Sequence, residues 1–159
     1  MVSPYLLKEV RTLLQASLDA FGTNRQYHEI VIDFLGCIRL PVIITDTRRA
    51  DLGPNIMFAN EAFAAMCAYT REELVGGSVK RLHGPLTDLE IAGTFRRSLE
   101  DQDMAEMSIV NYRKTGEPYR VRVLASKLDK SVPQSRSFRI AFALEENPAP
   151  RESSYSVTP

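Results

Sequence analysis

Two cysteines and two histidines are the side chains of this 159-residue chain best suited to nucleophilic or metal chemistry. Cys37 and Cys67 form no C-x-x-C pair, so they predict neither a redox motif nor a disulfide framework. His28 and His83 stand apart from any acidic cluster in metal-binding spacing, so we expect no metal site. The sequence shows no nucleophile–base motif and no phosphate-binding loop of the form G-x-x-x-x-G-K-[ST]. These residue types favour a protein that is not an enzyme.

The charge balance and the hydropathy of the chain argue against nucleic-acid and membrane partners. Twenty Lys and Arg balance twenty Asp and Glu, so the net charge is zero and binding that rests on phosphate neutralisation is disfavoured. Among the basic side chains, Lys80 and Arg96 remain candidates to meet a single anion. No apolar run approaches the roughly 20 residues that span a bilayer, and no signal-peptide pattern opens the chain. We therefore expect a cytoplasmic protein that binds neither nucleic acid nor membrane.

The first 36 residues predict two amphipathic helices. Apolar residues recur at three- and four-residue steps from Leu6 to Phe21, and again between Gln26 and Leu35, and each run ends at a glycine. Such an apolar face must be buried against something. It either covers the main core or forms a dimer interface, and Leu7, Val10 and Leu14 are our interface candidates.

Helix-capping signals follow two short predicted strands, at residues 42–45 and 56–59. Asn60 can cap a helix over residues 61–66. Thr70 with Glu73, and Thr87 with Glu90, each match the capping-box pattern. The second box predicts a longer helix that ends near Glu100.

The last third of the chain predicts an antiparallel sheet. Residues 107–112 and 119–126 flank a glycine-containing hairpin loop, and residues 138–144 alternate bulky with smaller or charged side chains. The bulky row includes Ile140 and Phe142, two further interface candidates. If the row lies on the outer face of the sheet, it needs a cover from the N-terminal helix or a second subunit, and otherwise it fills the internal cavity. The order of elements predicts an α+β fold with a five-stranded antiparallel sheet and helices on one face. We divide the chain into a helical segment (1–36), a core (37–146) and a flexible tail (147–159).

Several spaced blocks closely resemble PAS domains of the LOV (light-oxygen-voltage) family. They are the segment from Asn55 to Phe63, the segment from Tyr69 to Gly76, the block around Leu82–Pro85, and the hairpin Asn111-Tyr-Arg-Lys-Thr-Gly116. The resemblance covers roughly residues 40–146 and implies the PAS fold. Helices that flank this core commonly mediate dimerisation in the family.

The resemblance also implies a departure from the photochemistry of the LOV family. Family members bind flavin and carry a cysteine in a Gly-x-Asn-Cys-Arg-Phe-Leu-Gln block, whose thiol adds to the flavin under blue light. The corresponding block here runs from Gly76 to His83 and places Val79 at the cysteine position. Valine has no nucleophilic atom, so we expect no cysteinyl-flavin adduct. The two cysteines of the chain lie elsewhere and suit small buried hydrophobic positions.

Most flavin-holding positions of the family are also altered. Asn111 keeps one ring-edge amide, whereas Val121 and Ala143 replace two others with side chains that cannot form hydrogen bonds. Ser78 and His83 replace further amides with different polar groups. Lys80 and Arg96 retain positive charge at the phosphate end. The expectation is that no cofactor is bound, with FMN held by Ser78, Lys80, His83, Arg96 and Asn111 as the alternative.

Three functions follow, in order of preference. The first is a non-catalytic LOV-like module that acts in signal transduction by binding another signalling protein or a second copy of itself. The second is a cysteine-less flavin sensor of blue light or redox state, in which Tyr112 or Tyr119 donates an electron. An enzyme is the weakest reading. Another small ligand, such as haem bound through His83 or His28, also remains open.

Overall fold

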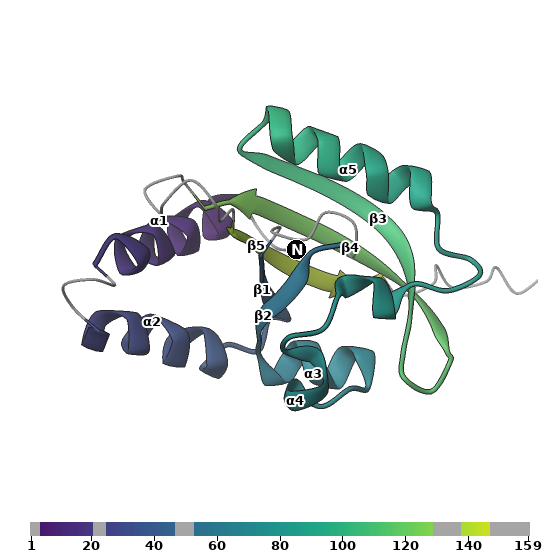
Figure 1. The fold of residues 1–159 in the computed structure, drawn as a ribbon, viewed down its shortest axis with the longest axis horizontal. Helices are drawn as coiled ribbons and strands as arrows, with labels where there is room; N and C mark the ends of the chain where they lie inside the picture. The colour runs from purple at the N-terminus through teal and green to yellow at the C-terminus, as the bar shows by residue number, and fades with distance from the viewer. Residues whose placement is uncertain (1–3, 21–24, 47–52, 129–137, 147–159) are drawn as a thin grey trace, which may run out of the picture.

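Five antiparallel strands form one sheet in this computed structural model, which describes residues 4–20, 25–46, 53–128 and 138–146 (Figure 1). The strands are β1 (Val42–Asp46), β2 (Asn55–Ala59), β3 (Met104–Tyr112), β4 (Pro118–Lys127) and β5 (Phe138–Glu145). Their order across the sheet is β2-β1-β5-β4-β3, so the last strand of the chain is the central one. This arrangement confirms the predicted α+β fold. The predicted tail, 147–159, lies outside the described residues.

Short helices pack on one face of the sheet, which we call the inner face. They are α3 (Glu61–Cys67), α4 (Arg71–Leu74), the 3-10 helix η1 (Val79–Leu82) and α5 (Leu89–Asp101). The predicted caps at Asn60 and Thr70 are confirmed, because each side chain accepts a hydrogen bond from a backbone N–H of the following turn. At Thr70 the reciprocal bond from its own N–H to Glu73 completes the capping box, at 3.0 Å.

The predicted capping box at Thr87 is wrong. Asp88 caps α5 instead, and its carboxylate accepts hydrogen bonds from the N–H groups of Glu90 and Ile91 at 2.9 and 3.1 Å. Thr87 is used elsewhere, since its hydroxyl donates to the Val110 carbonyl on β3 at 2.7 Å. A tertiary contact therefore moves the start of the helix by one residue.

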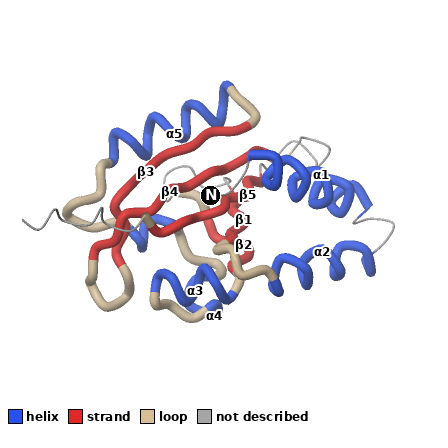
Figure 2. Tube along the Cα trace, turned by 180° about the vertical axis from the view of Figure 1, so that it is seen from behind, coloured by secondary structure: helices blue, strands red, loops and turns tan. Residues whose placement is uncertain are grey.

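Helices α1 (Pro4–Ala20) and α2 (Arg25–Cys37) cover the opposite, outer face of the sheet (Figures 1 and 2). Together with the sheet they bury an apolar cluster that contains Leu7, Val10, Val31, Leu35, Val42, Ile44, Phe58, Leu128, Ile140 and Phe142. The bulky row of β5 thus lies on the outer face, and its cover comes from the same chain. Burying a side chain the size of Phe142 contributes roughly 1.5–3 kcal/mol.

Four of the proposed interface residues consequently need correction. Leu7, Val10, Ile140 and Phe142 are all buried within this cluster, so they are not available to a second subunit in this arrangement. The side chain of the fifth, Leu14, lies outside the described residues. The alternation of β5 predicts two faces, but it does not identify which face the N-terminal helices cover.

The fully buried side chain of Asn60 links the N-terminal helices to the sheet. Its amide oxygen accepts from the N–H groups of Val42 and Phe63, both at 3.0 Å. Its amide nitrogen lies 2.8–3.2 Å from three carbonyl oxygens at and beyond the end of α2, those of Leu35, Ile38 and Leu40. One amide therefore fixes the end of α2, the start of β1 and the first turn of α3.

We predict that Asn60→Ala lowers the free energy of unfolding by about 3 kcal/mol or more, because it leaves several buried backbone groups without partners. Asn60→Asp keeps the acceptor for two N–H groups but sets a carboxylate against three carbonyls, so it should also destabilise. Urea unfolding followed by circular dichroism measures both variants. The control, Asn55→Ala, changes an amide with no such network and should stay within about 0.5 kcal/mol of the wild type. Equal effects of Asn60→Ala and Asn55→Ala would contradict this role of Asn60.

We predict that Leu7→Ala costs about 2–5 kcal/mol of stability, since it opens a cavity between α1 and the outer face. Leu13 is on the same helix but 43% exposed, and Leu13→Ala should cost less than about 1 kcal/mol. Chemical unfolding of the two variants gives a matched comparison. Similar small losses in both would mean that α1 does not pack on the sheet in solution.

Candidate ligand-binding and interaction site

Asn111 and Tyr119 form a buried polar pair on the inner face, at directly opposed positions of β3 and β4. The Tyr119 hydroxyl is buried and has no hydrogen-bond partner among the described residues, although the Asn111 side chain lies close enough to lower its pKa. Burial raises the pKa of Tyr119. The guanidinium of Arg113 lies 4.5 Å from the centre of the tyrosine ring, a cation–π contact. This corner of the interior thus holds an unsatisfied, protonated phenol.

The two thiols occupy different environments. Cys67 is buried at the end of α3, where its Sγ lies 3.2 Å from the Phe63 carbonyl. Burial raises the pKa of the Cys67 thiol, which keeps it protonated and a poor nucleophile. Cys37 is exposed at the end of α2. Both cysteines were expected to be small buried hydrophobic residues. The burial of Cys67 supports this expectation, and the exposure of Cys37 shows that it is wrong for that residue.

The three altered family positions lie in or against the inner apolar cluster. Val121 and Ala143 are buried in it, and Val79 packs on its edge. Arg139 shares the strand face of Ala141 and Ala143, and its buried Nε has no hydrogen-bond partner. Burial lowers the pKa of Arg139, and the neighbouring Arg96 acts in the same direction. The sequence analysis did not single out Arg139, although its place in the alternation of β5 was available as a signal.

Three of the predicted cofactor-binding residues come together in and beside η1. The Ser78 hydroxyl caps this helix and accepts from the Lys80 N–H at 3.2 Å. The His83 N–H closes the helix by donating to the Lys80 carbonyl. Burial lowers the pKa of His83, and the charge of Lys80 lowers it further. Arg96 lies on α5 with its side chain exposed and close enough to Arg139 for the two charges to interact.

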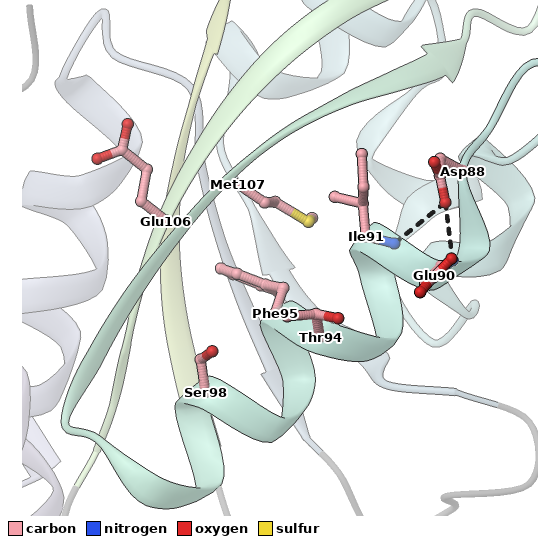
Figure 3. Close-up of a pocket in the computed structure, with 8 residues that line it drawn as sticks. All are labelled: Asp88, Glu90, Ile91, Thr94, Phe95, Ser98, Glu106 and Met107. Carbon is pink, nitrogen blue, oxygen red and sulfur yellow. Dashed lines mark hydrogen bonds between the residues drawn. The ribbon is translucent and has the colours of Figure 1, made fainter.

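A groove of about 330 Å³ runs between α5 and β3 (Figure 3). Ile91 and Phe95 from α5 face Met107 from β3 and make an apolar floor. Asp88, Glu90 and Glu106 contribute carboxylates, and Thr94 and Ser98 contribute hydroxyls. Residue spacing does not predict this groove, because the groove depends on how α5 lies along β3.

The loop before α5 is held firmly against β3. The Leu86 N–H donates to the Tyr112 hydroxyl at 2.9 Å, and the Gly84 N–H donates to the Thr87 hydroxyl at the same distance. A Cβ at Gly84 would come within 2.4–2.8 Å of the Tyr112 ring, so only glycine fits there. These contacts fix the start of α5 and with it one end of the groove.

Residues 41–142 match the protein family described as PAS domain, which is well over half of the chain. The chain belongs to the PAS domain family. Blue-light-activated histidine kinase of Brucella anthropi is 39% identical over 111 residues, a match that covers 68% of this PAS chain and 22% of that protein. Phototropin-2 of Oryza sativa subsp. japonica is 35% identical over 77 residues, which cover 48% of the chain and 8% of that protein. The chain therefore spans less than a quarter of either relative.

Solved structures support the same fold. The LOV domain of the blue-light activated histidine kinase from Erythrobacter litoralis EL346 superposes with a TM-score of 0.61 at 22% identity, over 70% of this chain and 99% of that one. A PAS domain from a two-component sensor histidine kinase gives a TM-score of 0.59 at 15% identity, over 75% and 96% of the two chains. The chain is thus a PAS domain with LOV-type homologues.

The inner face fits a LOV-type flavin poorly. At two of the positions where the resemblance expects ring-edge amides, Val121 and Ala143 pack into the apolar cluster and offer no hydrogen bond. Among the described residues, the polar groups that the inner face offers include the amide of Asn111, the hydroxyl of Tyr119 and the Nε of Arg139. This donor set does not reproduce the hydrogen bonds that hold a flavin ring edge, each worth about 0.5–1.5 kcal/mol.

Metal and membrane chemistry find no support in the part of the chain that the structure describes. Within the described residues, no three His, Cys, Asp or Glu side chains are placed to hold a metal ion. None of the described helices combines the length and apolar character needed to cross a bilayer. The side chain of His28 lies outside the described residues, and that of His83 stands beside Lys80 rather than an acidic group.

We predict that His83 makes the domain less stable in mild acid. Its folded-state pKa is depressed below its unfolded value of about 6.5, so only the unfolded chain takes up the proton just below that pH. The stability of the wild type should therefore fall as the pH drops below about 6.5. The stability of the His83→Asn variant should fall less over the same range. Thermal unfolding across this range measures both proteins. Parallel pH profiles would contradict the assignment to His83.

Proposed function

We propose that this PAS domain acts in signal transduction as a non-catalytic module that binds other protein segments and forms no cysteinyl-flavin adduct. The observation that carries the proposal is Val79, which stands where the LOV resemblance requires a thiol and packs against the inner cluster. The Cys67 thiol is engaged on α3 and kept protonated by burial. Any output activity then belongs to a partner or to another part of a longer protein.

The signalling context comes from relatives. Proteins named as blue-light-activated histidine kinases and phototropins match this chain over its PAS core. In those two proteins the matched region is a small part of the length, 22% and 8%, whereas the PAS match covers most of this chain. We infer that the domain passes a conformational or binding signal to an attached or separate signalling protein.

The N-terminal helices supply a surface for a second copy of the chain. Leu6 and Leu13 on α1, and Ile30 and Phe34 on α2, are large apolar side chains that the monomer leaves exposed. Exposed groups of this kind mark interaction surfaces. We expect a two-fold dimer that packs α1 of each subunit on α2 of the other to bury these exposed side chains.

A cysteine-less flavin sensor is the second candidate. It is favoured by Asn111 and by two buried polar atoms on the inner face, Tyr119 Oη and Arg139 Nε, that lack protein partners. Buried polar groups without partners are costly, and a ligand that satisfies them gains affinity. In that case Tyr112 or Tyr119 is the electron donor, and both are within the described core.

The decisive experiment refolds the purified chain with excess FMN and records its absorption spectrum after gel filtration, with light scattering for mass. We expect a colourless dimer. A yellow monomer would overturn both parts of the proposal. In a yellow preparation, light-dependent loss of the visible flavin band in Val79→Cys alone would show that the flavin binds where the LOV resemblance places it, and light-dependent loss in the wild type would support the second candidate.

Matched variants test the dimer surface in the same measurement. Ile30→Glu combined with Phe34→Glu should reduce the mass to that of a monomer, because it places carboxylates in the proposed contact. Met57→Glu changes a side chain of similar exposure on β2 and should leave the mass unchanged. A dimer that survives the paired α2 substitutions would show that another surface joins the subunits.

A further inference from the structure

The groove between α5 and β3 lies next to a cluster of exposed apolar side chains. Leu86, Leu89 and Ile91, which precede and begin α5, are 65%, 67% and 38% exposed. Ile91 also lines the groove together with Phe95 and Met107, whereas Leu86 and Leu89 are exposed just before the residues that line it. An apolar groove of this kind, with exposed apolar side chains beside it in the sequence, suits the binding of another molecule.

The rim of the groove is acidic. Asp88 and Glu90 stand at its α5 end, and Glu106 contributes from β3 (Figure 3). Glu106 already pairs with Arg122, and one oxygen of Asp88 caps the helix. Glu90 and the second oxygen of Asp88 remain to meet a partner. Among the described residues no lysine or arginine lines the groove itself, and the two arginines that touch its lining are bonded to Thr94 and Glu106 rather than to Glu90.

From these features we propose that the α5–β3 groove docks a linear segment of a partner protein that carries alternating basic and large apolar side chains. The groove volume suits one or two side chains, so one apolar side chain enters between Ile91, Phe95 and Met107. A neighbouring lysine or arginine then reaches Glu90 and Asp88, while adjacent apolar residues cover Leu86 and Leu89. Charge complementarity selects a basic segment over an acidic one.

This surface is separate from the other sites of the domain. Its lining residues include none of the inner-face residues Asn111, Tyr119 and Val121, and none of the residues of α1 or α2. The inference rests on the proposed function only in expecting a protein partner. Phe95 and Met107 of the floor also pack against the inner cluster, but α1 and α2 contribute nothing to the lining, so a different dimer surface would overturn the dimer proposal without affecting the groove.

Two matched peptides test the proposal on the full chain, observed by ¹⁵N–¹H correlation spectra during titration. The probes are acetyl-Leu-Lys-Leu-Lys-amide and acetyl-Leu-Glu-Leu-Glu-amide, which share their apolar content and differ in charge. We expect the lysine peptide to shift amide signals of residues 86–98 and 106–107, with an affinity that falls as salt is added. Equal responses to both peptides, no response to either, or shifts that map elsewhere would overturn the proposal.

Variants separate the charged and apolar contributions. Asp88→Asn with Glu90→Gln removes two charges while asparagine preserves the cap, and should weaken the lysine peptide by at least about threefold. Glu61→Gln with Glu72→Gln removes two charges on other helices and should have no effect. Ile91→Ser should weaken binding through the apolar floor. If the Asp88/Glu90 pair and the control pair behave alike, the acidic rim does not select the ligand.

Discussion

One buried amide holds the two halves of this PAS domain together. Asn60 directly follows β2, caps α3, accepts from the start of β1 and donates to carbonyls in the last turn of α2 and just beyond it. Asparagine can do this because its side chain carries both an acceptor and a two-hydrogen donor. An aspartate would repel the carbonyls, and a leucine would leave both sets of backbone groups unsatisfied in the interior. The N-terminal helices are therefore fixed to the sheet by specific hydrogen bonds as well as by apolar packing.

The central strand gives the two faces of the sheet different characters. On the outer face of β5, Ile140 and Phe142 fill the space under α1 and α2, while Ala141 and Ala143 face the short helices. The large side chains thus fill the space between the sheet and the outer helices, and the small ones lie on the inner face. Adjacent residues of β5 pack against the inner helices and against α1 and α2. A displacement of the strand on the inner face would therefore also move side chains that contact α1 and α2.

Local sequence rules predicted most of the elements, and non-local contacts explain the failures. Asn60 and Thr70 cap their helices as predicted, since a cap depends on residues within one turn. At α5 two adjacent residues could serve as the cap, and the Val110 carbonyl on β3 decides between them by binding Thr87. The bulky row of β5 followed from period-two alternation, but its cover depends on where α1 packs. The same limit applies to Leu7 and Val10, whose apolar spacing predicts burial without naming the partner surface.

In the candidate site, too, local relations could be predicted from the sequence and non-local relations could not. Residues close together in the sequence, Ser78, Lys80 and His83, are together in the structure because one turn of η1 joins them. Arg96, Asn111 and Arg139 depend on three separate elements, so their relation could not be predicted from spacing.

The distribution of polar groups changes what kind of ligand the domain suits. Its interior has apolar side chains at Val121 and Ala143, where the LOV resemblance expects amides, while its surface leaves Leu86 and Leu89 exposed beside two carboxylates. A small polar ligand needs hydrogen bonds in the interior, whereas a peptide needs an open apolar surface with a charged rim. The zero net charge of the chain is consistent with the second case, because selectivity then comes from the local charge of the groove and not from a long-range field. The physical chemistry of this domain therefore favours recognition at its surface over chemistry in its core.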